Sequence, residues 1–127
     1  MTTNILIMCP HNAAKSVVAA AYLGRIAEQR SLDIAISTAG TDPDEEVLPI
    51  VRQQLEQDGY PTEHTPRAFE PAELREADRI INIGCARQTL ATETPITDWG
   101  IPNFSEDPSA AFAALAEHVE LLAAELS

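Results

Sequence analysis

Short apolar runs rich in β-branched residues, at positions 4–8, 34–38 and 79–83, constrain this chain more than any other sequence feature. Runs of this length and composition are typical of strands, and those at 4–8 and 79–83 are expected to be buried on both faces of a sheet. Helical patterns lie between them, and strands that alternate with helices form a parallel sheet with right-handed crossovers. The sequence therefore predicts an α/β fold with helices on both faces of the sheet.

Individual residues in the sequence indicate where the first two predicted helices begin and end. Ser16 opens the first helix, which ends near Arg30. The second helix comes after a turn at residues 42–44, carries Pro49 in its first turn, where a missing N–H is tolerated, and ends at Gly59. Its predicted buried side comprises Val47, Ile50, Val51 and Leu55.

The second half of the chain continues the alternation of helix and strand. A short helix ends near Glu76, and residues 95–102 are irregular with a short edge strand. Asp107 and Pro108 begin the last helix as its N-cap and first residue. With the edge strand the sheet has four strands, so we predict a single three-layer α/β/α domain over residues 1–127. The buried stripe of the last helix comprises Phe112, Leu115, Val119 and either Leu122 or Leu126.

The charge and cysteine content of the chain exclude several classes of protein. Its 8 basic and 20 acidic residues give a net charge of −12, which repels nucleic acid and anionic membrane surfaces. No apolar run is long enough to span a membrane or to form a signal peptide. Cys9 and Cys85 are too few for a disulfide scaffold, and we predict a cytoplasmic protein.

The segment from Cys9 to Ser16 has the composition of an anion-binding loop. Cys9 directly follows the first strand, Ser16 begins a helix, and the residues between them are mostly small or polar. Parallel sheets bind ligands at the carboxyl ends of their strands, and a helix N-terminus attracts anions through its N–H groups and dipole. The same field favours a thiolate at Cys9. The predicted oxyanion-binding residues are Pro10, His11, Asn12, Ala13, Ala14 and Lys15.

The loop sequence Cys9-Pro10-His11-Asn12-Ala13-Ala14-Lys15-Ser16 resembles the Cys-x5-Arg-Ser/Thr loop of the low-molecular-weight tyrosine phosphatase and arsenate reductase family. The likeness is greatest to thiol-dependent arsenate reductases, whose loops often read Cys-x-His-Asn-Ala-x-Arg-Ser. Segments 37–41, 77–85 and 98–102 also resemble the family, in the same order along the chain. The resemblance implies the family's fold and a ligand such as phosphate, arsenate or a phosphorylated molecule.

By this resemblance Cys9 is the nucleophile, Ser16 hydrogen-bonds its thiolate, and Asn12 braces the loop in a left-handed turn. Two positions depart from the family pattern. Lys15 stands where the family has arginine, so the positive charge is kept but the two parallel N–H bonds from arginine to an oxyanion are lost. Asn103 stands where the family has its general acid, an aspartate followed by proline. Acid–base catalysis commonly contributes about 100- to 10,000-fold, so the chain should be a poor tyrosine phosphatase.

Arsenate reduction is less affected by these departures, because attack of a thiolate on arsenate releases only hydroxide or water. Cys85 matches the place of the family's second cysteine and is a candidate redox partner. Thr94 precedes Pro95 where thioredoxin-coupled members have a third cysteine, so a three-cysteine relay is impossible. A two-cysteine relay or an external thiol remains open, and we predict no other cofactor.

Several of these residues also have purely structural interpretations. Cys9 and Cys85 can each be a small buried apolar side chain, and Lys15 can be a solvated lysine. His11 either tunes the thiolate or hydrogen-bonds the backbone. A metal site made from Cys9, Cys85 and His11 lacks any standard ligand spacing, so no metal is predicted.

Two aspartates are candidates to replace the missing acid. Asp107 lies four residues after Asn103, but the helix that begins there favours it as a cap. Asp98 has no specific support. The remaining histidines, His64 and His118, are predicted on the surface.

Two functions fit these observations. The first is a thiolate-dependent enzyme, arsenate reductase-like or a weak phosphatase, in which Cys9, Lys15, Ser16 and Asn103 form the catalytic site. The second is a catalytically impaired module that binds phosphate or phosphorylated partners without turnover, which would explain the joint loss of arginine and aspartate.

Overall fold

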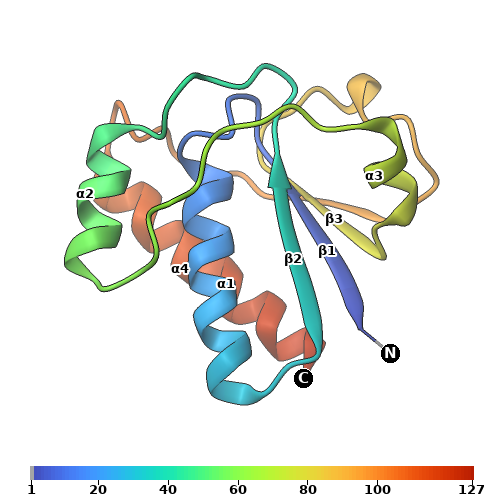
Figure 1. Cartoon of the computed structure of the whole chain (residues 1–127), viewed down its shortest axis with the longest axis horizontal. Helices are drawn as coiled ribbons and strands as arrows, with labels where there is room; N and C mark the ends of the chain where they lie inside the picture. Colours follow the sequence, from blue (N-terminus) through green and yellow to red (C-terminus); the bar gives the residue numbers. More distant parts are fainter. Residues whose placement is uncertain (1) are drawn as a thin grey trace.

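Four parallel strands form one sheet in the computed structural model, which describes residues 2–127 (Figure 1). The strands are β1 (Thr3–Met8), β2 (Ile34–Ala39), β3 (Arg79–Asn82) and β4 (Ile96–Asp98), and their order in the sheet is β2-β1-β3-β4. Each neighbouring pair is parallel. The predicted strands and the α/β class are confirmed, and β4 lies at one edge, as expected for the short strand within residues 95–102.

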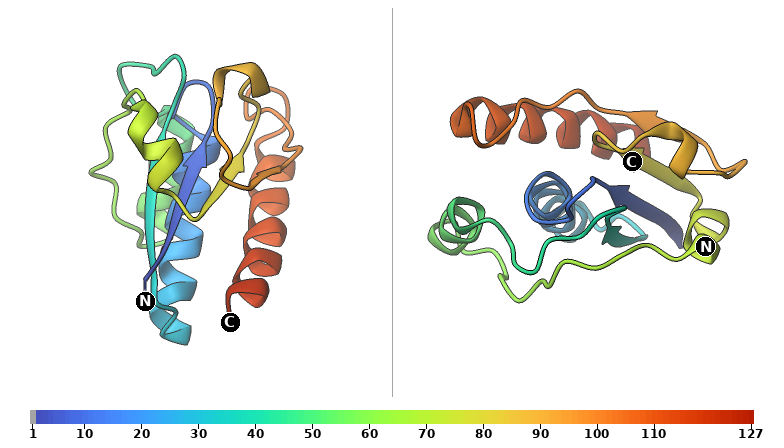
Figure 2. Two further views of the ribbon diagram at one scale, coloured as in Figure 1. Left: turned by 90° about the vertical axis from the view of Figure 1, so that its right-hand side faces the viewer. Right: turned by 90° about the horizontal axis from the view of Figure 1, so that it is seen from above.

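Helices cover both faces of this sheet, so the predicted three-layer arrangement is confirmed. The helices are α1 (Lys15–Arg30), α2 (Pro49–Gln57), α3 (Pro71–Glu76) and α4 (Pro108–Leu126), and Arg87–Thr89 form the 3₁₀ turn η1. Figure 2 shows α1 and α4 on one side of the strands and α3 on the other, with α2 beyond α1. None of the helices within residues 2–127 is long and apolar enough to cross a membrane.

Alternate residues of β1 face the two parts of the core. Ile5 and Ile7 belong to the larger cluster, which includes buried residues of α1 and α4. Leu6 and Met8 belong to a smaller cluster that includes Leu74 of α3. Complete burial of a side chain of this size stabilises a fold by about 1.5–3 kcal/mol. The core on both faces therefore fixes β1, and with it the point where the next loop begins.

The predicted ends marked by Pro49, Gly59 and Asp107 are confirmed, whereas the first helix begins one residue before Ser16, at Lys15. Pro49 is the first residue of α2, and Gly59 comes after that helix with a φ of 78°. The side chain of Asp107 accepts a hydrogen bond from the Ala110 N–H at 3.1 Å and so caps α4. Within the predicted stripe of α4, Leu115, Val119 and Leu122 are buried, whereas Phe112 and Leu126 are partly buried.

Three expectations from the sequence are wrong in detail. Ile50 is 40% exposed rather than buried. His118 is not on the open surface, because its ring stacks on buried Trp99 with 5.1 Å between the centroids. The second helix does not continue directly from the turn at 42–44, since residues 42–48 are irregular. The N–H groups of that segment bond to carbonyls of the Cys9 loop instead: Asp42 to Pro10, Asp44 to His11 and Leu48 to Ala13, at 2.8, 3.0 and 2.9 Å.

Candidate oxyanion site at Cys9

Cys9 lines a cavity of about 520 Å³ at the carboxyl end of β1. The residue directly follows the strand and is only 4% exposed, and the next residues lead into α1. The structure brings Lys15 and Asn103, which are distant in the sequence, to this same cavity. The lining residues are Cys9, Pro10, His11, Ala13, Ala14, Lys15, Asp44, Leu48, Ile83, Gly84, Asn103, Phe104 and Ser105.

The backbone of the Cys9 loop is suited to receive an anion. The carbonyls of Pro10, His11 and Ala13 are already bonded to the segment before α2. In contrast, the N–H groups of residues 11–16 donate to no acceptor within residues 2–127. These donors are left for a ligand, and those at the start of α1 also carry the positive end of the helix dipole.

A chain of side-chain hydrogen bonds ends on the Cys9 sulfur. Ser16 Oγ lies 3.0 Å from Cys9 Sγ, and Asn12 Nδ2 donates to the same hydroxyl oxygen at 2.8 Å. Because Asn12 already donates to the hydroxyl oxygen, the proton of Ser16 is free to point at the sulfur. A sulfur anion accepts such a bond more strongly than a thiol does.

Asn12 fixes both this network and the turn of the loop. Its φ of 49° lies in the left-handed region, and its side chain is fully buried. Asn12 Oδ1 accepts hydrogen bonds from His64 Nε2 at 3.0 Å and from the Arg67 N–H at 3.1 Å. The asparagine therefore joins the Cys9 loop to a segment more than fifty residues away.

His64 is a site residue that sequence reasoning missed. The prediction that it lies on the surface is wrong, because its ring is half-buried and bonded to Asn12. Burial lowers the pKa of His64 below its usual value, and the nearby Arg67 guanidinium adds to this effect. A histidine in an irregular loop has no periodic pattern that could have placed it.

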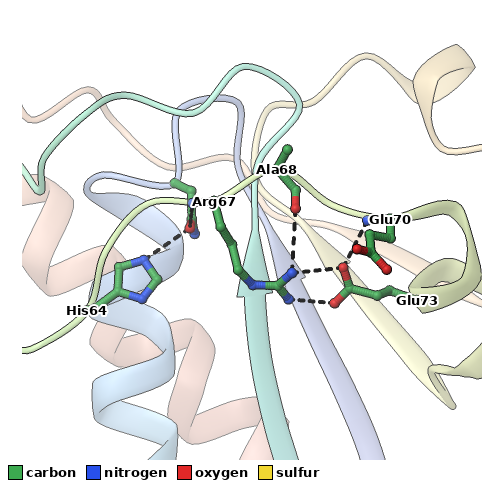
Figure 3. Close-up of polar contacts among 6 residues, drawn as sticks. His64, Arg67, Ala68, Glu70 and Glu73 are labelled. Atoms are coloured by element: carbon green, nitrogen blue, oxygen red, sulfur yellow. Dashed lines mark hydrogen bonds and ion pairs between the residues drawn. The ribbon is translucent and has the colours of Figure 1, made fainter.

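Arg67 connects the loop after α2 to α3 (Figure 3). Its guanidinium forms a two-point ion pair with Glu73, and Nη1 of Arg67 lies 2.9 Å from Oε1. The hydrogen bond from Arg67 holds the pKa of the Glu73 carboxyl below its usual value. Glu73 also accepts from the Glu70 N–H at 2.9 Å at the start of α3. Arg67, whose backbone N–H bonds to Asn12, is thus held by its side chain against α3.

Gly40 allows the end of β2 to approach the Cys9 loop closely. A Cβ at this position would lie 2.6 Å from the carbonyl oxygen of Pro10 and 2.9 Å from that of Cys9. Both contacts are with backbone atoms, so any side chain here would displace the loop. The only sequence signal for this role is the resemblance of segment 37–41 to the family pattern.

The two residues that depart from the family pattern contact each other. Lys15 Nζ donates a hydrogen bond to Asn103 Oδ1 at 3.0 Å. The aspartates considered as replacement acids are engaged elsewhere, since Asp107 caps α4 and Asp98 pairs with Arg87 at 2.7 Å. Neither aspartate is among the residues that line the cavity.

His11 bonds to the backbone, which is the structural one of its two predicted roles. Its Nδ1 lies 3.0 Å from the carbonyl oxygen of Asp42 and 3.3 Å from Oδ1 of Asp44. Both neighbours are acceptors, so this nitrogen carries a proton. The ring thereby adds a further link between the Cys9 loop and the segment before α2.

Cys85 is separate from the hydrogen-bond network of Cys9. It is 6% exposed and belongs to the smaller core cluster. Its N–H donates to Asn82 Oδ1 at 3.0 Å, and its sulfur is 3.9 Å from the Thr41 hydroxyl. Burial raises the pKa of the Cys85 thiol, and the charge of Cys9 adds to the rise. Within residues 2–127, no group of three or more His, Cys, Asp or Glu side chains could hold a metal ion.

Comparison with families of proteins gives one match over most of the chain. The model described as low molecular weight phosphotyrosine protein phosphatase matches residues 4–96. This range includes the whole Cys9 loop and Cys85 but ends before Asn103. No curated protein matches the chain significantly.

Solved structures share the fold across nearly the whole chain. The thioredoxin-dependent arsenate reductase of Corynebacterium glutamicum matches with a TM-score of 0.83 at 22% identity, over 98% of this chain and 62% of that protein, so this chain spans less than two thirds of its length. The arsenate reductase of Archaeoglobus fulgidus matches with a TM-score of 0.75 at 27% identity, over 94% of this chain and 98% of that one. The tyrosine phosphatase Wzb of Escherichia coli K30, in complex with sulphate, matches with a TM-score of 0.81 at 18% identity over 100% of both chains.

Proposed function

The chain belongs to the low molecular weight phosphotyrosine protein phosphatase family, and we propose that it is an enzyme whose Cys9 thiolate attacks a bound phosphate-like or arsenate oxyanion. The observation that carries the proposal is the set of N–H groups at residues 11–16, which have no acceptor within residues 2–127. They surround the start of α1, next to a cysteine whose sulfur meets the Ser16 hydroxyl at 3.0 Å.

Binding of the oxyanion rests on these N–H groups and on Lys15. Preorganised donors stabilise the charge of the oxyanion and of the transition state without reorganisation during the reaction. Lys15, at the first position of α1, adds a positive charge to the cavity. Because the chain as a whole is acidic, with a net charge of −12, this local charge is needed to attract an anion.

Hydrolysis of a phosphate ester proceeds slowly at such a site. The thiolate attacks phosphorus, an S–P bond forms and the P–O bond to the leaving group breaks; water then hydrolyses the phosphocysteine. The leaving oxygen needs a proton, and the amide of Asn103, which lines the cavity, is not an acid. We therefore expect at most weak activity toward esters with poor leaving groups.

Arsenate reduction suits the site better. The thiolate attacks arsenic, an S–As bond forms, and the departing oxygen leaves as water with the two protons of the monoanionic arsenate. A second thiol then attacks the Cys9 sulfur: an S–S bond forms, and the electron pair of the S–As bond stays on arsenic. Arsenic(V) is thereby reduced to arsenite, and two thiols are oxidised to a disulfide.

The second thiol is proposed to come from outside the chain. Cys85 is buried and its pKa is raised, and both features slow attack on the Cys9 adduct. A small-molecule thiol or a protein of the thioredoxin type can supply the electrons, and a further thiol restores Cys9. The arsenate reductase of Corynebacterium glutamicum is described as thioredoxin-dependent.

One observation favours the alternative of a binding module without turnover. Asn103 holds Lys15 by a hydrogen bond at the place where the family has its acid, so the cavity has donors for an anion but no proton source of that kind. In this alternative, phosphate binds and remains unreacted.

The experiment that tests the enzyme compares the unmodified protein with Cys9→Ser. Arsenate reduction with glutathione or reduced thioredoxin, and hydrolysis of p-nitrophenyl phosphate, are measured for both proteins. We expect reduction well above background in the unmodified protein and none in Cys9→Ser. Equal rates in the two proteins would exclude the enzyme, and phosphate binding by calorimetry without turnover would support the binding module.

A further inference from the structure

The contact between Lys15 and Asn103 joins two walls of the cavity. Lys15 begins α1, whereas Asn103 lies in the segment between β4 and α4. Lys15 Nζ is 3.0 Å from Asn103 Oδ1, and both residues line the cavity with Cys9. Both side chains thus reach the ligand space, although 88 residues separate them in the sequence.

The chemistry of the two groups fixes the orientation of the asparagine. An ammonium group only donates, so the amide oxygen must face Lys15 and the amide nitrogen must point away from it. Asn103 Nδ2 has no acceptor within residues 2–127, and the ammonium keeps two further N–H donors after the bond to Oδ1. The pair therefore presents donors from two different nitrogen atoms.

Charge explains why an amide suits this position. A carboxylate at residue 103 would form an ion pair with Lys15 and would repel an incoming oxyanion. An amide holds the ammonium in place by a hydrogen bond but leaves its charge uncompensated. Arginine normally provides two parallel N–H bonds to an oxyanion from one side chain, and here two side chains together offer the same number of donor atoms.

We propose that Lys15 and Asn103 act as a matched pair that binds the oxyanion, Lys15 through its charge and Asn103 through Nδ2, and that this pair favours free tetrahedral oxyanions over phosphate esters. The proposal rests on the proposed function of the Cys9 site. An ester takes the proton for its leaving group from the protein, and an amide does not supply one. A free oxyanion such as arsenate carries its own protons, so the absence of an acid costs it little.

Calorimetry with inorganic phosphate tests the pair. For Asn103→Asp we expect phosphate binding weakened roughly tenfold or more, because the new carboxylate pairs with Lys15. For Asn103→Ala, which loses one donor, we expect a loss of about three- to tenfold. Ser105→Asp is the matched control, since it adds the same charge to the same cavity wall, where no bond to Lys15 is present; its effect should be clearly smaller than that of Asn103→Asp.

A second measurement tests the preference for free oxyanions. Lys15→Arg combined with Asn103→Asp restores the arginine and the general acid that the family has at these positions. Hydrolysis of p-nitrophenyl phosphate should therefore rise by about 100-fold. No rise in this double variant would overturn the preference. Phosphate binding unchanged in Asn103→Asp, or equally weak in Ser105→Asp, would overturn the pairing.

Failure of this proposal is distinguishable from failure of the proposed function. If Cys9→Ser abolishes arsenate reduction while Asn103→Asp binds phosphate normally, only the matched pair is wrong. If Cys9→Ser reduces arsenate as well as the unmodified protein does, the enzyme is wrong, and the phosphate titrations still decide whether the pair binds an anion.

Discussion

Two neighbouring strands of this protein are followed by cysteine-bearing loops, which lie at the carboxyl ends of the strands. β1 is followed directly by Cys9, and β3, which pairs with β1 in parallel, is followed by Cys85. Both thiols are buried, at 4% and 6% exposure, and each loop is braced by a buried asparagine. Asn12 makes three hydrogen bonds in the first loop, and Asn82 makes three at the second.

The two loops lead into different elements. The Cys9 loop enters the 16-residue helix α1, and its N–H groups lack acceptors within residues 2–127. The Cys85 loop enters the three-residue turn η1, and the N–H of Cys85 already bonds to Asn82. The sulfur of Cys9 lies 3.0 Å from the Ser16 hydroxyl. The thiol of Cys85 instead packs in an apolar cluster, and its pKa is raised. A place after a parallel strand therefore does not by itself decide whether a cysteine can act as a nucleophile; the hydrogen-bond partners, the neighbouring N–H groups and the desolvation of the thiol do.

Replacing each cysteine in turn is the strongest test of this difference. Cys9→Ser should lower arsenate reduction by about 1,000-fold or more, because the proposed nucleophile is lost. Cys85→Ser should retain activity within about threefold, since its thiol is buried in the core and outside the cavity. Steady-state rates with an external thiol decide the matter, and a loss in Cys85→Ser as deep as that in Cys9→Ser would make both cysteines part of one relay.

The asparagines of the two loops give the next largest contrast. Asn12→Ala and Asn82→Ala each remove three hydrogen bonds and leave buried polar partners unsatisfied, so each should lower the free energy of unfolding by about 2–4 kcal/mol. Only Asn12→Ala should also abolish phosphate binding, because it releases Ser16 and the left-handed turn at φ 49°. Urea unfolding and calorimetry measure the two effects.

The control for this pair is Asn12→Gly, which keeps the left-handed turn but removes the side-chain bonds. It should unfold more easily than the unmodified protein yet remain more stable than Asn12→Ala, since glycine adopts positive φ without strain. Equal loss of phosphate binding in Asn82→Ala at temperatures where it is folded would show that the two loops act as one unit.

Alkylation by iodoacetamide compares the two thiols in a single protein. The pKa of Cys85 is raised by burial, so its modification should be slow at pH 7 and accelerate only under alkaline conditions. Cys9 should react about tenfold faster at neutral pH because it lines an open cavity next to a helix N-terminus, and added phosphate should protect it. Mass spectrometry of peptides reports each rate, and phosphate protection of Cys85 instead of Cys9 would reverse the assignment.

The fold could be predicted from the sequence wherever local chemistry determines it. The apolar runs that form β1 and β3 are buried in the sheet, the run at 34–38 forms the edge strand β2, and Pro49, Gly59 and Asp107 mark helix ends through their own backbone or side-chain properties. These signals act within a few residues, so a single sequence shows them.

Long-range contacts could not be predicted in the same way. Residues 42–48 look ready to enter a helix, yet their N–H groups are used by carbonyls of the Cys9 loop. His64 shows no pattern, but it supports Asn12 across 52 positions. The resemblance to the family identified Lys15 and Asn103 as departures, whereas only the structure shows that they bond to each other.

The smallest expected effect concerns His64, which bonds to Asn12 at the Cys9 loop, whereas Asn82 at the Cys85 loop bonds to the carboxylate of Asp98. Burial lowers the pKa of His64, so below about pH 6.5 the unfolded chain binds more protons than the folded one. The free energy of unfolding therefore decreases as the pH decreases. Above that pH its contribution is complete. Urea unfolding between pH 8 and 5 should show this loss in the unmodified protein and a flatter profile in His64→Gln. His11→Gln, at an exposed ring, is the matched control and should keep the slope. A slope that survives in His64→Gln would assign the pH dependence to other groups.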